Sequence, residues 1–103
     1  MGKLVRDKIP AIIEADGKTS VTRILDNEMY EMELYIKLTE EMQEFLNAVT
    51  KTDAIEELAD LIEVIHALAK SHGASVEELE RVRKKKLEER GAFDDKIFLI
   101  KVK

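Results

Sequence analysis

The segment from Thr52 to Ser71 constrains the fold of this chain more than any other. Its apolar residues recur on nearly every side of a helix, which leaves no face suited to water alone. Such a helix belongs at the centre of other helices, so we expect an all-α fold in which its neighbours cover it. The apolar residues are Ile55, Leu58, Leu61, Ile62, Val64, Ile65, Ala67, Leu68 and Ala69.

Two helices are predicted before this segment. Pro10 suits the first turn of a short helix from about Lys8 to Asp16, because the N–H that proline lacks has no partner there. Asp26 or Asn27 can cap a second, long helix that continues to about residue 50 with apolar residues at helical spacing.

Capping signals also delimit the third and fourth helices. Thr52 can cap the central helix, and the connection before it is so short that the second and third helices should be antiparallel neighbours. Ser75 and Glu78 form a capping box that opens a fourth helix, which runs to Arg90 before Gly91.

Two segments outside the helices are rich in β-forming residues. These are Lys18 to Leu25 and the tail from Lys96 to Val102, which we expect to form short strands that pair with each other. The predicted fold is therefore one domain over residues 1–103, an antiparallel bundle of about four helices with short terminal β segments.

Composition excludes several classes of partner. The net charge is -5, aromatics are 5% and tryptophan is absent, so the chain lacks both the positive field and the stacking surfaces of nucleic-acid binders. The N-terminus has no apolar signal region, and no apolar run approaches membrane-spanning length. We therefore expect a cytoplasmic protein with neither nucleic acid nor membrane as a partner.

Two pairs of acids are the candidate functional residues. Glu41 and Glu44 lie three residues apart on the second helix, and Glu57 and Asp60 lie three apart on the third. If the antiparallel helices bring the pairs together, their charges repel unless a proton or a cation compensates them, and Mg²⁺ prefers such oxygen ligands. The alternative is a solvated helix face, since acid pairs are common in a chain with 22 Asp and Glu residues.

The acidic pattern, E-E-x-x-E followed after a gap by E-x-x-D, resembles the signature of the MazG-like all-α nucleoside triphosphate pyrophosphohydrolases. It reads EEMQE from Glu40 to Glu44 and ELAD from Glu57 to Asp60. The stretches KLVRDKIPAII, EELADLIEVIHAL and ERGAFDDKIFLI are similar to the short phosphoribosyl-ATP pyrophosphohydrolase-like branch of this superfamily. The likeness covers nearly the whole chain.

This resemblance implies a role for each acid and an activity. Glu41, Glu44, Glu57 and Asp60 would be ligands of Mg²⁺, with Mn²⁺ as the alternative ion, and Glu40 would join Glu41 in catalysis by helping to position water. Members cleave the bond between the α and β phosphates of a nucleotide, in some cases as house-cleaning enzymes. They assemble as homodimers or homotetramers with sites near subunit interfaces.

Basic residues that could bind substrate phosphates occur in two places. Lys86 and Arg90, one turn apart on the fourth helix, are the preferred pair, and Lys3 and Arg6 near the N-terminus are the second set. Each could equally be solvated surface. Arg6 and Asp7 resemble a motif of the family, but the sequence assigns the motif no chemical role.

Two other functions are compatible with the sequence. One is true phosphoribosyl-ATP hydrolysis in histidine biosynthesis, and the other is a non-catalytic helical module that binds a partner through its apolar faces. No residue pattern identifies a preferred nucleobase.

Overall fold

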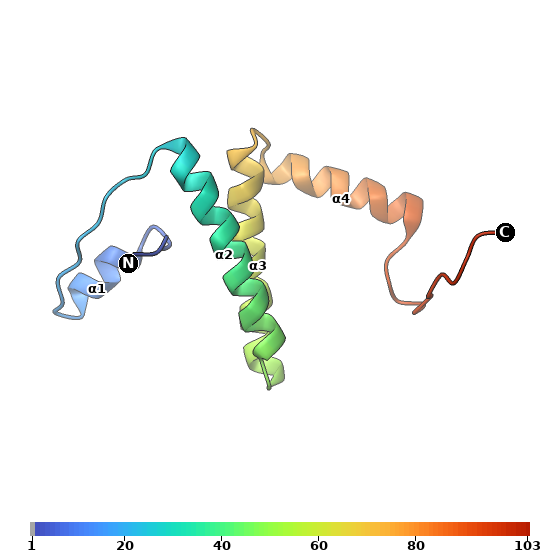
Figure 1. The fold of residues 1–103 in the computed structure, drawn as a ribbon, viewed down its shortest axis with the longest axis horizontal. Coiled ribbons are helices and arrows are strands. Elements are labelled where there is room, and N and C mark those ends of the chain that lie inside the picture. The colour runs from blue at the N-terminus through green and yellow to red at the C-terminus, as the bar shows by residue number, and fades with distance from the viewer. Residues whose placement is uncertain (1) are drawn as a thin grey trace.

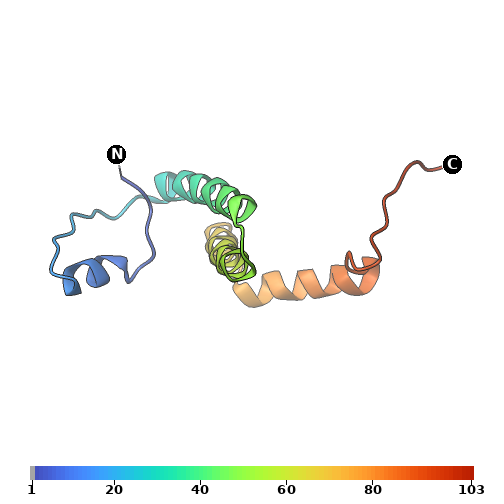
Figure 2. The ribbon, with the colours of Figure 1, turned by 90° about the horizontal axis from the view of Figure 1, so that it is seen from below.

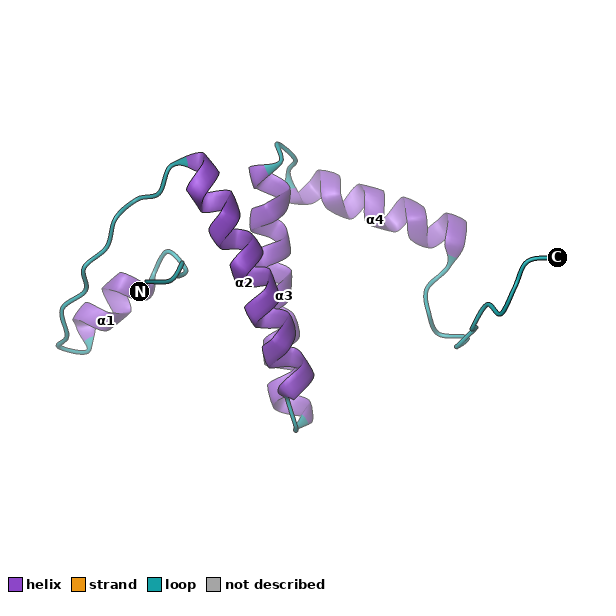
Figure 3. Cartoon of the chain, viewed as in Figure 1, coloured by secondary structure: helices purple, strands orange, loops and turns teal. Residues whose placement is uncertain are grey.

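The structure, a computed structural model, describes residues 2–103, and its regular elements there are all α-helices, joined and flanked by loops (Figure 3). The helices are α1 (Ile9–Ala15), α2 (Asn27–Asn47), α3 (Lys51–Ser71) and α4 (Val76–Arg90). The predicted all-α class is confirmed. The predicted strands are wrong, because no strand occurs among residues 2–103. Their β-branched residues favour extended backbone, but a strand also needs a hydrogen-bonded neighbour, and the two segments lie at opposite ends of the molecule (Figure 1).

Two of the predicted caps are confirmed. The Asp26 side chain accepts a hydrogen bond from the backbone N–H of Met29 at 2.8 Å, which begins α2. The Ser75 hydroxyl accepts one from the backbone N–H of Glu78 at 3.0 Å, which begins α4. These bonds satisfy N–H groups that the first turn of a helix leaves without partners.

The junction between α2 and α3 differs from the prediction. Thr50, not Thr52, caps α3 by accepting a hydrogen bond from the backbone N–H of Asp53 at 3.1 Å. Helix α2 ends at Asn47 rather than near residue 50. Thr50 is the cap because its backbone is extended, as an N-cap requires, whereas Thr52 already lies in the first turn of α3.

Helices α2 and α3 form an antiparallel pair, and the other elements extend away from it (Figures 1 and 2). Helix α4 packs only against α3, and α1 packs against none of the other three helices. The radius of gyration is 17.7 Å, compared with about 13 Å for a compact domain of this length. One chain thus forms an open arrangement that does not enclose a core of its own.

The burial of individual residues also shows that the described part of the chain forms no complete core. Leu34 of α2, 3% exposed, is the only hydrophobic residue that is fully buried among the described residues. Helix α3 contacts both α2 and α4, as expected of a central helix, yet it has no buried residue. A stripe of large side chains along it stays exposed, and we call it the α3 stripe: Ile55, Leu58, Ile62 and Ile65. No helix within residues 2–103 combines the length and the apolar character needed to cross a membrane.

Candidate metal centre

Three of the four predicted ligands meet between α2 and α3. Glu41 and Glu44 come from successive turns of α2, and Glu57 faces them from α3. One carboxylate oxygen from each residue lies within 4.8 Å of those of the other two. The antiparallel packing of the helices therefore produces the convergence that the sequence predicted for these three acids, which we call the acidic cluster.

Two buried oxygens distinguish this cluster from a solvated acidic face, although its third member, Glu44, is exposed. Glu41 is only 9% exposed, and its Oε2 atom is buried without a hydrogen-bond partner. The Oε2 atom of Glu57 is also buried and unpartnered. A buried polar atom without a partner costs free energy, and more so when it belongs to a charged group. The two orphaned oxygens are thus acceptors that a cation would satisfy.

The surroundings of Glu41 and Glu57 raise their affinity for protons. Burial raises the pKa of the Glu41 carboxyl, and the nearby charges of Glu44 and Asp60 raise it further. Hydrogen bonding with Glu44, followed by burial, raises the pKa of Glu57 to about 7. Without a cation, the cluster therefore holds a proton near neutrality, and a cation would displace it.

Asp60, the fourth predicted ligand, is close to the cluster but has a different partner. Its Oδ1 atom accepts a hydrogen bond from Nη1 of Arg6 at 3.2 Å. The Asp60 charge still raises the pKa values of Glu41 and Glu57. The side chain lies at the margin of the cluster rather than inside it.

Lys37 is a member of this region that the sequence analysis missed. Its Nζ lies 3.7 Å from Oε1 of Glu41 and 3.6 Å from Oε2 of Glu40. Its side chain is 22% exposed, so this cation is held against the cluster rather than free in solvent. The sequence could have indicated this contact, because Lys37 lies four residues before Glu41 and side chains at that spacing share a helix face.

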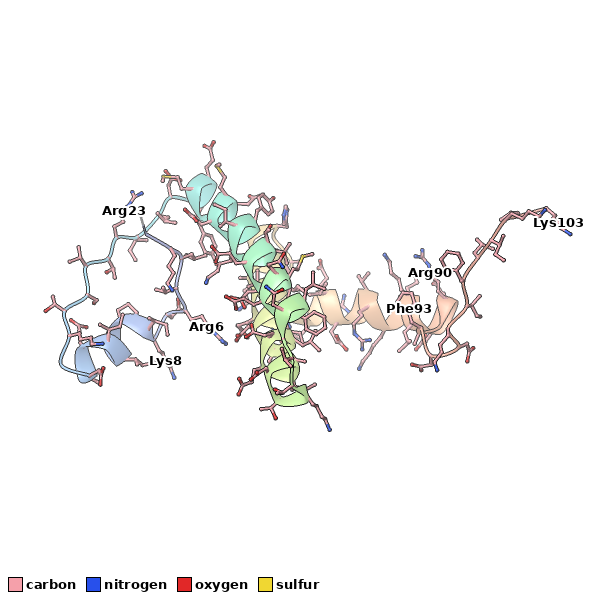
Figure 4. The ribbon with its side chains drawn as sticks, turned by 60° about the horizontal axis from the view of Figure 1, so that its bottom comes forward. Arg6, Lys8, Arg23, Arg90, Phe93 and Lys103 are labelled. Atoms are coloured by element: carbon pink, nitrogen blue, oxygen red, sulfur yellow. The ribbon has the colours of Figure 1, made fainter. Side chains whose placement is uncertain are left out.

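The predicted phosphate-binding residues lie in different parts of the molecule. Lys86 and Arg90 are exposed on α4, and Figure 4 shows Arg90 on the opposite side of the α2–α3 pair from Arg6. Lys3 is exposed on the N-terminal segment. Of these four basic residues, Arg6 is the one that contacts a predicted metal ligand, Asp60. The preferred pair, Lys86 and Arg90, does not contact the acidic cluster of its own chain.

The stability of the metal-free protein is expected to fall as pH rises from about 4.5 to about 7. The folded state raises the pKa of Glu57 from its ordinary 4.5 to about 7, so protonation favours folding below this range, and that contribution is lost as pH rises through it. Thermal midpoints measured with a chelator between pH 4.5 and 8 test this. Glu57→Gln should flatten the decline, whereas Glu56→Gln, its exposed neighbour, should not. An equal slope in both variants would contradict the assignment.

Comparison with known proteins gives one relative. No family model and no solved structure matches the chain. An uncharacterized protein of Mycolicibacterium smegmatis is 45% identical over 56 residues, which cover 54% of this chain and 57% of the relative. The chain thus spans less than two thirds of that relative, whose description names no activity.

Proposed function

We propose that this protein is a Mg²⁺-dependent nucleoside triphosphate pyrophosphohydrolase that releases a nucleoside monophosphate and pyrophosphate. The observation that carries the proposal is the acidic cluster, in which Glu41, Glu44 and Glu57 converge with two buried, unpartnered carboxylate oxygens. The resemblance of the E-E-x-x-E and E-x-x-D motifs to the MazG-like enzymes supports the choice of reaction. The substrates would be drawn from the cytoplasmic nucleotide pool.

The residues present fit a magnesium ion. Glu41, Glu44 and Glu57 would hold it. The resemblance adds Asp60, which lies at the margin of the cluster and whose charge acts on Glu41. A bound ion supplies neutralisation of phosphate charge and a lowered pKa for water, and Mn²⁺ could replace it. Lys37 keeps Glu40 and Glu41 in place, so that Glu40, exposed beside the cluster, can accept a hydrogen bond from the attacking water.

A pyrophosphate-release screen tests this function. With Mg²⁺, the protein should hydrolyse at least one member of a panel of ordinary and damaged nucleoside triphosphates, and a chelator should abolish the release. Phosphoribosyl-ATP belongs in the panel, because its selective hydrolysis would identify the histidine-biosynthesis enzyme instead. If the whole panel stayed intact, the proposed reaction would be wrong.

A non-catalytic interaction module is the second candidate, and the exposed α3 stripe favours it. The two functions differ in their response to Mg²⁺ alone. An ion bound only by the folded state stabilises it and so raises the thermal midpoint. At an ion concentration 100 times the dissociation constant, the gain in unfolding free energy is about 2.7 kcal/mol. An unchanged midpoint at millimolar Mg²⁺ would favour the module.

We also propose that the chain assembles as a homodimer or homotetramer. The support is the open shape of the single chain, with one fully buried hydrophobic residue in the described part and large apolar side chains left exposed on α2 and α3. A second copy would cover apolar surface that this chain leaves in water.

A further inference from the structure

Arg6 connects the N-terminal segment to the α2–α3 pair. The segment precedes α1, which packs against no other helix, and Figure 4 shows Arg6 directed from it toward α2 and α3. Nη1 of Arg6 lies 3.2 Å from Oδ1 of Asp60, and Nη2 lies 3.8 Å from Oε1 of Glu63. One guanidinium therefore spans two carboxylates on successive turns of α3.

The contact occupies an oxygen of Asp60, which lies at the margin of the acidic cluster and is the fourth ligand in the proposed function. Oδ1 of Asp60 accepts a hydrogen bond from Arg6 and is thereby satisfied without metal. The side chains of Arg6 and Asp60 are 64% and 43% exposed, and ion pairs this exposed are weak because water screens them. A divalent cation held by the acidic cluster would therefore have only a weak contact to break if it recruited Asp60 as a further ligand.

The displaced guanidinium would remain beside the site. It is permanently charged, and its planar fork of N–H donors matches the oxygens of a phosphate. Glu63 lies one turn beyond Asp60 and offers Arg6 a second contact that does not involve a predicted metal ligand. After leaving Asp60, Arg6 would thus remain beside α3 through its contact with Glu63.

We propose that Arg6 exchanges partners: it pairs with Asp60 in the metal-free protein, and when a divalent cation takes Asp60 it binds a phosphate of the ligand. The inference rests on the proposed function for the cation and the phosphate ligand. It adds a specific residue and a predicted antagonism between Arg6 and the metal.

Arg6→Ala should have opposite effects on two equilibria. Without its competitor, the cation should bind about two- to fivefold more tightly, the range expected for loss of an exposed ion pair. The cation-loaded protein should bind pyrophosphate at least about tenfold more weakly, because charge-assisted hydrogen bonds to phosphate are lost. Calorimetric titration with Mn²⁺ alone, and then with inorganic pyrophosphate in excess Mn²⁺, measures both without requiring turnover.

Two further variants distinguish partner exchange from a general effect of positive charge. Arg6→Lys keeps the charge without the fork and should restore pyrophosphate binding only in part. Complete restoration would reduce Arg6 to a long-range charge and overturn the exchange. Arg83→Ala is the matched control, since Arg83 is similarly exposed and pairs with Glu80 on α4, and it should change neither equilibrium.

The other possible results of the Arg6→Ala titrations also test the partner exchange. Weaker binding of both Mn²⁺ and pyrophosphate in Arg6→Ala would indicate a structural role, and unchanged Mn²⁺ binding would remove the competition; either overturns the proposal. If the opposite effects occur but no nucleotide is hydrolysed, the exchange stands and the proposed function fails. If nucleotides are hydrolysed without the opposite effects, only the exchange fails.

Discussion

Glu41→Gln should lower Mg²⁺-dependent pyrophosphate release by roughly 100-fold or more while leaving the metal-free fold at least as stable. A bound cation contributes several kcal/mol to such a reaction, and each 1.36 kcal/mol is a factor of ten in rate. Glutamine removes the charge of a ligand that is 9% exposed. The same change relieves repulsion from Glu44 and Asp60, which raise the pKa of Glu41.

The opposite directions of these effects make the experiment informative. A residue that only supports the fold would lose stability and activity together, whereas a ligand paired with like charges loses activity and gains stability. Rates are compared at saturating Mg²⁺, and thermal midpoints in the presence of a chelator. Glu56→Gln, an exposed acid on α3, is the control and should alter neither quantity appreciably. An active Glu41→Gln enzyme would remove Glu41 from the proposed site.

The features predicted correctly from the sequence depend on nearby residues. Asp26 and Ser75 cap their helices through bonds to N–H groups three positions later, so the signal and its partner lie in one short stretch. The convergence of Glu41, Glu44 and Glu57 follows from two helical spacings and a tight connection. Each requires only the geometry of one helix or one helix pair.

The features missed by the sequence analysis depend on placement in space. The Arg6–Asp60 contact joins residues 54 positions apart, and no periodicity specifies where an irregular N-terminal segment will lie. The segment around Val21 was wrongly predicted as a strand, because whether it finds a strand partner depends on where the distant tail lies. The burial expected for α3 failed for a related reason, because one chain supplies too few helices to surround it.

Ile62→Glu should dissociate the proposed homo-oligomer or weaken it by at least about 100-fold. The residues of the α3 stripe fall within about 80° of the helix circumference, and Ile62, 51% exposed in the single chain, lies between the others. Glu57 and Asp60 lie about 80° to 140° away from the stripe, so a second copy could cover it beside the acidic cluster. Burying an unpaired carboxylate in such an interface costs several kcal/mol, and each 1.4 kcal/mol is tenfold in affinity.

Light scattering coupled to size exclusion measures this dissociation, and Ile12→Glu is the matched control. Ile12 is 58% exposed on α1, outside the α2–α3 pair, so a glutamate there adds the same charge to an equally wet position. Only Ile62→Glu should shift the mass toward that of a monomer. A wild-type protein that is monomeric at high concentration, or equal shifts in both variants, would contradict a role for the α3 stripe. In that case, a different partner or a different face would have to cover the apolar surface that the single chain leaves in water.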